Sequence, residues 1–171
     1  MIRRSLLAIG PALAISAIAS SQSFAQAGLS RHSGTWRIDA SRSSFSDGTF
    51  PPNMSLTIDM TISNGRIVYG SVNDTNKTRP PSLTNFDTTL DGVPSAFLGQ
   101  DRFNKISVLQ LNPNEFRIMK MKDDDVIVGE FWTFLRDRRT LVRRGVGKNA
   151  TGKSRVFEEY FVRTGPSKAR N

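Results

Sequence analysis

Two glutamates interrupt alternating series of apolar and aromatic residues. The series are Val126, Val128, Glu130, Trp132 and Phe134, and Val156, Glu158, Tyr160 and Val162. Side chains two apart in a β-strand lie on the same face, so each series predicts one face of a strand. If both faces point into a protein interior, desolvation would raise the carboxyl pKa values. Glu130 and Glu158 could then serve as general acid and base.

The alternation is equally compatible with the opposite register, because a shift of one residue exchanges the two faces of a strand. Both glutamates would then face solvent, with Phe131 inward on one strand and Phe157 and Phe161 inward on the other. Charged residues are rarely buried alone. We therefore favour glutamates that are solvated or structurally paired.

Four further residues are candidates for lining a ligand site: Trp132, Tyr160, Arg117 and Tyr69. Arg117 shares a predicted face with Met119 and Met121, and a cation beside adaptable thioethers would suit an amphiphile with an acidic head. The alternative, which we favour for Arg117, is an arginine lying across apolar surface with its charge in water.

Composition excludes several kinds of chemistry. The 171 residues include no cysteine and a single histidine, so disulfides, thiolate metal sites and His-rich sites are not expected. We predict no cofactor, no metal and no role for His32. Lys and Arg exceed Asp and Glu by 24 to 15, which gives a formal charge of +9. Part of this excess is a basic stretch comprising Arg136, Arg138, Arg139, Arg143, Arg144, Lys148 and Lys153.

The basic stretch lacks regularly interleaved aromatic residues, so we expect no nucleic-acid partner. It is interpreted as a solvated cationic face, with weak association with anionic envelope surfaces as an alternative. Residues 147–154 also match the pattern of a phosphate-binding loop. Only 17 residues follow Ser154, too few for a helical crossover to a parallel strand, so a polar hairpin loop is predicted there.

The rest of the chain reads as short strands separated by turn signals. Leu56, Ile58, Met60 and Ile62 alternate with polar residues, and Asn64-Gly65 is typical of a hairpin turn. Nine or ten such segments follow one another at even spacing between Trp36 and Val162, with no long amphipathic helix. We predict an all-β protein, an antiparallel up-and-down barrel of about 8–10 strands.

The N-terminus is predicted to be a cleavable signal peptide. Residues 1–27 combine Arg3 and Arg4, an apolar run interrupted by Pro11, and a cleavage motif ending at Ala27. We expect a flexible leader at 28–33, the barrel domain at 34–164, and a flexible tail at 165–171. The mature protein is expected in the periplasm or secreted.

Three stretches carry a family resemblance. Gly34-Thr35-Trp36 followed by Arg42 to Phe45 resembles the opening of small exported bacterial lipocalin-like (calycin-type) proteins, which begin with a G-T-W motif. Residues 90–94 and 145–153 are similar to two later motifs of that group, although Leu90 replaces a tyrosine and Pro94 falls one place early. The resemblance implies a barrel with a ligand-sized interior and an arginine packed over the Trp36 ring, with Arg163 the first candidate and Arg143 the second.

These observations lead to three hypotheses. The first is an exported, non-catalytic barrel that binds an apolar or amphiphilic small molecule. The second is a barrel enzyme, an isomerase, hydratase or lyase that uses Glu130 and Glu158. The third is a structural or protein-binding module of the cell envelope. They differ in whether the barrel is hollow and in which way the two glutamates point.

Overall fold

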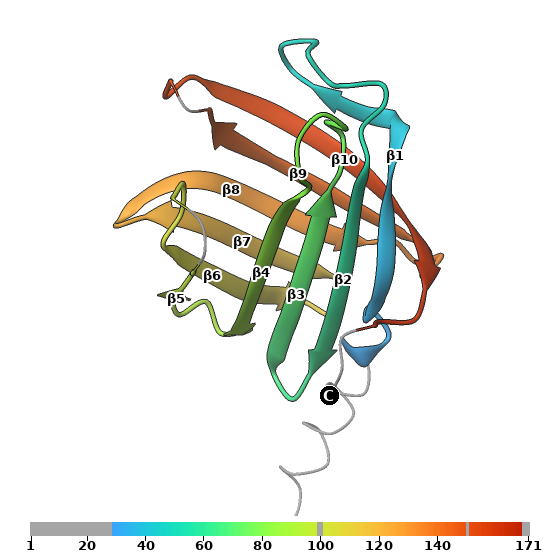
Figure 1. Ribbon diagram of the computed structural model, residues 1–171. Helices are drawn as coiled ribbons and strands as arrows, with labels where there is room; N and C mark the ends of the chain where they lie inside the picture. Colours follow the sequence, from blue (N-terminus) through green and yellow to red (C-terminus); the bar gives the residue numbers. More distant parts are fainter. Residues whose placement is uncertain (1–28, 99–100, 150, 169–171) are drawn as a thin grey trace, which may run out of the picture.

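The computed structural model describes residues 29–98, 101–149 and 151–168, which form one curved antiparallel sheet (Figure 1). Its ten strands are β1 (Gly34–Phe45), β2 (Leu56–Ser63), β3 (Arg66–Asn73), β4 (Ser82–Thr89), β5 (Ser95–Ala96), β6 (Lys105–Asn112), β7 (Glu115–Lys122), β8 (Asp125–Phe134), β9 (Thr140–Lys148) and β10 (Ser154–Gly165). Helix is confined to a single turn before β1 within this part of the chain. The predicted all-β antiparallel fold class is confirmed.

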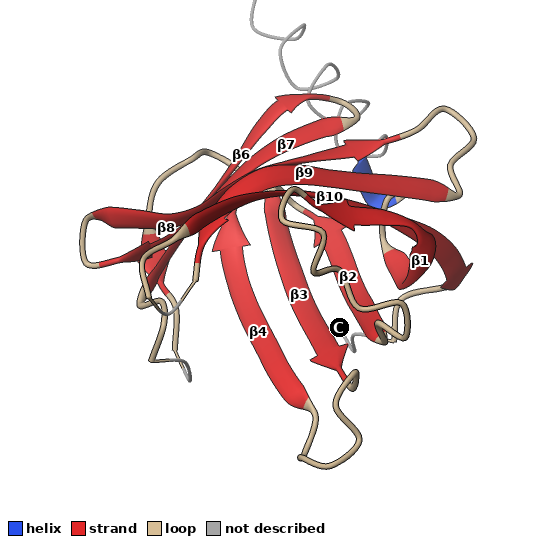
Figure 2. Cartoon of the chain, turned by 90° about the horizontal axis from the view of Figure 1, so that it is seen from above, coloured by secondary structure: helices blue, strands red, loops and turns tan. Residues whose placement is uncertain are grey.

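The sheet follows the order β4-β3-β2-β1-β10-β9-β8-β7-β6-β5 and curls into a nearly closed barrel. The β2–β4 strands cross the β6–β9 strands steeply when the molecule is viewed from above (Figure 2). β4 and β5 are the two ends of the sheet. Just after β4, the amide of Gly92 donates to the carbonyl of Val108 at 2.9 Å, and the amide of Gln110 donates to Leu90 at 3.0 Å. These bonds connect the segment just after β4 to β6, beside the β6–β7 turn.

Alternation along the strands determines which side chains fill the barrel. Leu56, Ile58, Met60 and Ile62 of β2 are all buried, as their spacing predicted. The turn that follows has positive φ angles of 50° at Asn64 and 67° at Gly65, and Asn and Gly are the residues that best tolerate this conformation.

One end of the barrel, which we call the floor, is packed with aromatic and aliphatic side chains. Trp36 is 1% exposed, and the Arg163 guanidinium lies over its ring at 5.7 Å from the centroid, which confirms the expected contact. A Cβ atom on Gly34 would lie 2.7 Å from Nε of Arg163. Glycine at the start of β1 therefore lets Arg163 approach the backbone.

Residues 29–33, which the sequence placed outside the barrel domain, pack beneath the floor. The His32 ring stacks on Phe134 at 4.0 Å, and its Nε2 lies 2.8 Å from the carbonyl of Pro113. Arg163 also donates to the carbonyl of Arg31 at 3.0 Å. The expectation that His32 has no role is therefore wrong, because it is a buried part of the floor. The predicted signal peptide lies outside the described residues.

The C-terminal segment lies along the outside of β1 and β2. The Ser167 hydroxyl donates to Asp59 at 2.7 Å, and the Lys168 amide donates to the same carboxylate at 2.8 Å. Part of the predicted tail thus packs on the barrel, and residues 169–171 lie outside the described residues. The phosphate-loop pattern lies in the connection of the antiparallel β9–β10 hairpin, as predicted, and a strand rather than a helix follows it.

Candidate functional site

The two glutamate-bearing strands adopt opposite registers. In β8 the predicted series points inward from Val128 through Glu130 and Trp132 to Phe134, and Glu130 is 1% exposed. Val126, which the prediction placed on the same face, lies beyond a register shift and is exposed. In β10 the inward series is instead Phe157, Glu159 and Phe161, as the pairing of Glu159 with Arg143 and of Phe161 with Leu141 requires. Glu158 and Tyr160 therefore point outward. The alternation left both registers open, and each strand takes a different one.

Four charged side chains from four adjacent strands meet inside the barrel: Lys120 of β7, Glu130 of β8, Arg143 of β9 and Glu159 of β10. We call them the interior charge cluster. Lys120 Nζ lies 3.0 Å from Glu130 Oε1, and Arg143 Nε lies 3.9 Å from Glu130 Oε2. Arg143 Nε donates to Glu159 Oε2 at 3.0 Å, and Nη2 contacts the same oxygen. Two cations and two carboxylates thus compensate one another.

The cluster keeps its charges despite burial. Desolvation would raise the pKa of Glu130, but the charges of Lys120 and Arg143 outweigh it and hold that pKa below its ordinary value. Burial acts to lower the pKa of Arg143, yet Glu159 and Glu130 raise it overall. Glu130 is therefore an ionised carboxylate at neutral pH. The alternative of a raised pKa at this position is contradicted, and the favoured expectation of a structurally paired glutamate is confirmed for Glu130, because Lys120 and Arg143 lie beside it.

Aromatic rings surround Arg143. Its guanidinium lies 4.8 Å from the Phe161 ring centroid and 5.8 Å from that of Trp132. Across the barrel, the Tyr69 hydroxyl lies 3.5 Å from Arg143 Nη1, and the Tyr69 ring stacks on Phe86 at 4.6 Å. Such rings favour a cation above their faces. They hold the Arg143 side chain in one orientation beside the cluster.

A cavity of about 530 Å³ lies above the cluster, toward the end of the barrel opposite the floor. We call this end the mouth; it carries the β1–β2, β3–β4, β5–β6, β7–β8 and β9–β10 connections. All four cluster residues line the cavity. Hydroxyl and amide groups line it from β3 and β4, and Leu56, Phe45, Phe103, Val128 and Phe157 supply apolar surface. The volume is within the range of small-molecule sites.

Two of the four predicted lining residues point inward and two do not. Tyr69 lines the cavity, and Trp132 is buried beneath it against Arg143 and Tyr69. Tyr160 lies on the outer face with the Arg42 guanidinium 4.3 Å from its ring centroid. Arg117 also lies on the outer face, beside Met119 and Phe131, where it lines a small apolar groove. Tyr160 and Arg117 therefore do not line the interior.

Glu158 does not join Glu130 as an acid–base pair. Its carboxylate lies 3.1 Å from Arg144 Nε on the outer face and also accepts from the Tyr160 hydroxyl. Hydrogen bonds from Arg144 and then Tyr160 lower the pKa of Glu158. The alternative of two desolvated carboxylates is thus contradicted, because β10 takes the register that turns Glu158 outward, where it is paired with Arg144 as the favoured expectation allowed.

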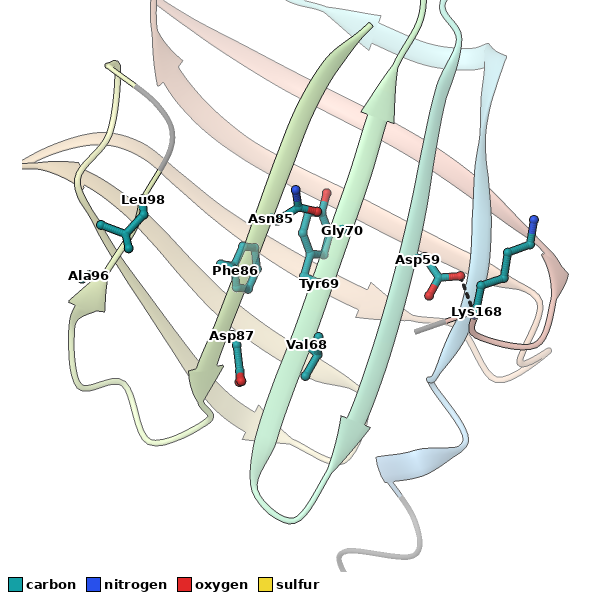
Figure 3. Close-up of a pocket in the computed structure, with 10 residues that line it drawn as sticks. All are labelled: Asp59, Val68, Tyr69, Gly70, Asn85, Phe86, Asp87, Ala96, Leu98 and Lys168. Atoms are coloured by element: carbon teal, nitrogen blue, oxygen red, sulfur yellow. Dashed lines mark hydrogen bonds between the residues drawn. The ribbon is translucent and has the colours of Figure 1, made fainter. Parts of the chain in front are cut away.

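A larger hollow of about 670 Å³ lies on the outside of the barrel, over β3 and β4 (Figure 3). Val68, Gly70, Asn85 and Asp87 form much of its surface, and Leu98 lies across from them (Figure 3). It is an open groove of mostly apolar surface without a buried charged side chain among its lining residues. We consider the smaller interior cavity the better site, because its buried polar groups are fixed by one another.

Sequence reasoning missed Glu159 and the central position of Arg143. Glu159 lies between Phe157 and Phe161, the two residues named for the alternative register. The alternation of these three residues could have identified Glu159 as an inward-facing glutamate. Arg143 was assigned to a solvated face, and that expectation is wrong: it is 7% exposed. Its two carboxylate partners and the rings around it come from other strands, and no local pattern identifies them.

The chain was compared with known proteins. No protein-family model matches it, and no curated protein matches it significantly. The interior cavity and its charges therefore carry the functional inference.

Proposed function

We propose that this protein is an exported, non-catalytic barrel that binds an amphiphilic small molecule in its interior cavity. The observation that carries the proposal is the cavity of about 530 Å³ above a fixed, self-compensated charge cluster. Ligand pockets combine apolar surface for affinity with fixed polar groups for orientation. This cavity offers both, and most of the residues that line it are polar or charged.

The lining favours an amphiphile over a wholly apolar ligand. Phe157 and Leu56 offer apolar contact, while Tyr69, Ser71 and Thr84 offer hydroxyl groups. A purely apolar molecule would remove water from these groups without replacing its hydrogen bonds, which is unfavourable. A molecule with both kinds of surface avoids that cost.

Export and the lipocalin-like relationship belong to the same proposal. The pattern of residues 1–27 supports passage to the periplasm or beyond, and the G-T-W opening supports the relationship. The excess of Lys and Arg over Asp and Glu supports weak association of the protein with anionic envelope surfaces.

The test is a fluorescence titration with two probes that brighten in apolar surroundings, the neutral phenylnaphthylamine and the amphiphilic anilinonaphthalene sulfonate. We expect saturable binding at one site. Thr84 lines the cavity on β4, so Thr84→Trp should fill part of the cavity and abolish binding. The matched control is Thr133→Trp on β8, whose side chain lies on the outer face beside Val142, and this variant should bind like the original protein.

Linear, unsaturable fluorescence with both probes would contradict the proposal, and so would equal binding by the two tryptophan variants. Circular dichroism of both variants shows whether each keeps its β-sheet signal, so lost binding can be distinguished from lost folding.

A further inference from the structure

Two arginines converge on the mouth from different parts of the chain. Arg102 lies in the connection between β5 and β6, and Arg155 lies near the start of β10; both line the cavity. The Arg102 guanidinium lies over Phe103, 4.9 Å from the ring centroid, and that of Arg155 lies over Phe45 at 3.7 Å. Each side chain is thus supported by an aromatic ring of the cavity lining.

The charges of these two arginines are poorly compensated. Within residues 29–98, 101–149 and 151–168, Arg102 forms no ion pair, and its one side-chain hydrogen bond found there goes to the carbonyl of Lys148. In the same ranges, Arg155 forms one ion pair, with Asp47 at 3.8 Å, and donates a hydrogen bond to Thr49. Partial burial, and after it the like charge of Arg155, lower the pKa of Arg102. Two cations that line the same cavity favour an anion between them.

The other charges around the cavity are already paired. Lys148 at the mouth lies 2.8 Å from Asp125, and Lys120 lies 3.0 Å from Glu130. Deeper in the barrel, Glu159 pairs with Arg143. The cavity therefore has balanced charge at its base and unbalanced positive charge at its mouth. This asymmetry would orient a bound amphiphile.

We propose that the ligand carries an oxyanion head, such as a carboxylate or sulfonate, that Arg102 and Arg155 bind at the mouth, while the rest of the ligand enters the cavity with its apolar surface against Leu56 and Phe157. This inference rests on the proposed function and names the ligand class. A guanidinium presents five N–H donors in a planar fork that matches the geometry of such a head. Few of these donors form hydrogen bonds with the described part of the protein.

The experiment compares two probes that differ only by an acidic group: phenylnaphthylamine and anilinonaphthalene sulfonate. Both are titrated against the purified protein and against Arg102→Gln and Arg155→Gln. The matched control is Arg66→Gln, which removes one exposed positive charge at the start of β3, at the floor end, where Arg66 pairs with Asp87 at 2.8 Å. It reports the effect of losing one positive charge far from the mouth.

We expect the sulfonate to bind the original protein more tightly than the neutral probe. Each mouth variant should weaken sulfonate binding by about tenfold, as loss of a charge-assisted hydrogen bond predicts. Neither variant should change the affinity for the neutral probe by more than about twofold. Added salt should weaken sulfonate binding only, because the mouth is open to solvent.

Equal affinity of the two probes, or equal losses in Arg66→Gln and the mouth variants, would overturn the inference while leaving the proposed function intact. If neither probe binds saturably, the proposed function itself fails. If one arginine variant does not fold, the other variant and the salt dependence of the original protein decide the question.

Discussion

At the residue scale, Arg143 is the side chain on which the interior depends most. It contacts Glu159 directly, lies 3.9 Å from Glu130 and reaches Tyr69 across the barrel. A buried ion pair adds little net stability over apolar side chains of similar volume, but removal of one partner leaves an uncompensated buried charge. Arg143 therefore compensates the buried charge of Glu159 and, together with Lys120, that of Glu130.

We predict that Arg143→Gln lowers the free energy of unfolding by about 3–5 kcal/mol, because both Glu130 and Glu159 lose their shared cation. The neighbouring Arg144→Gln provides the control. Arg144 pairs with Glu158 on the outer face, where the two side chains are 54% and 37% exposed, and exposed pairs contribute at most about 1 kcal/mol. Urea denaturation measures both variants, and equal losses would show that the interior cluster is not buried as described.

His32 makes the stability of the folded protein depend on pH. Burial, as the main cause, lowers its pKa below the ordinary 6.5 in the folded protein. As pH falls below 6.5, the unfolded chain takes up a proton before the folded one does. The stability contributed by neutral His32 is therefore complete above that pH and is lost progressively below it.

We predict that the unfolding free energy of the original protein falls between about pH 7.5 and pH 5.5, whereas that of His32→Phe stays level. Phenylalanine keeps a ring against Phe134, and no other histidine titrates in this window. Urea denaturation at several pH values measures the difference. Parallel pH profiles for the two proteins would mean that His32 is solvated in the folded state.

At the scale of elements, β8 and β9 approach closely where the cluster is built. Gly145 of β9 pairs with Glu130 of β8, and a Cβ atom on Gly145 would lie 2.8 Å from the Cα and Cβ atoms of Glu130 and would also contact the carbonyl of Gly129. Glycine here lets the backbone of β9 pass beside Glu130. The two strands then hold Glu130 near Arg143.

We predict that Gly145→Ala destabilises the fold by about 1–3 kcal/mol, the usual effect of forcing extra atoms into a packed site. Gly165→Ala at the end of β10 is the control, because nothing lies within 4 Å of a Cβ atom added there. Thermal unfolding of the two variants distinguishes them. A loss in Gly145→Ala no greater than in Gly165→Ala would contradict the close approach of β8 and β9.

Elements were predictable from sequence to the extent that their signals are local. The Asn64-Gly65 turn and the alternation in β2 identified a hairpin correctly. The inward face of β10 was not predictable, since both of its faces carry aromatic residues and a glutamate. The register there depends on pairing with β9 and β1, which are fixed only when the barrel forms.

At the scale of the whole molecule, the barrel is filled at one end and hollow at the other. Trp36, Phe134 and Phe161 are fully buried at or near the floor, whereas the mouth end holds a cavity of about 530 Å³. The sequence predicted a barrel but could not divide its interior in this way, because the division depends on which side chains from distant strands meet. The cavity that results has compensated charges at its base and uncompensated positive charge at its mouth.

The most direct test of ligand binding in this interior is a ¹H–¹⁵N NMR titration of the protein with anilinonaphthalene sulfonate. We expect saturable shifts concentrated at residues that line the cavity, such as Ser71, Thr84 and Gly147. Saturable shifts confined instead to the outer groove, at Val68, Asn85 and Asp87, would place the site outside the barrel and contradict the account.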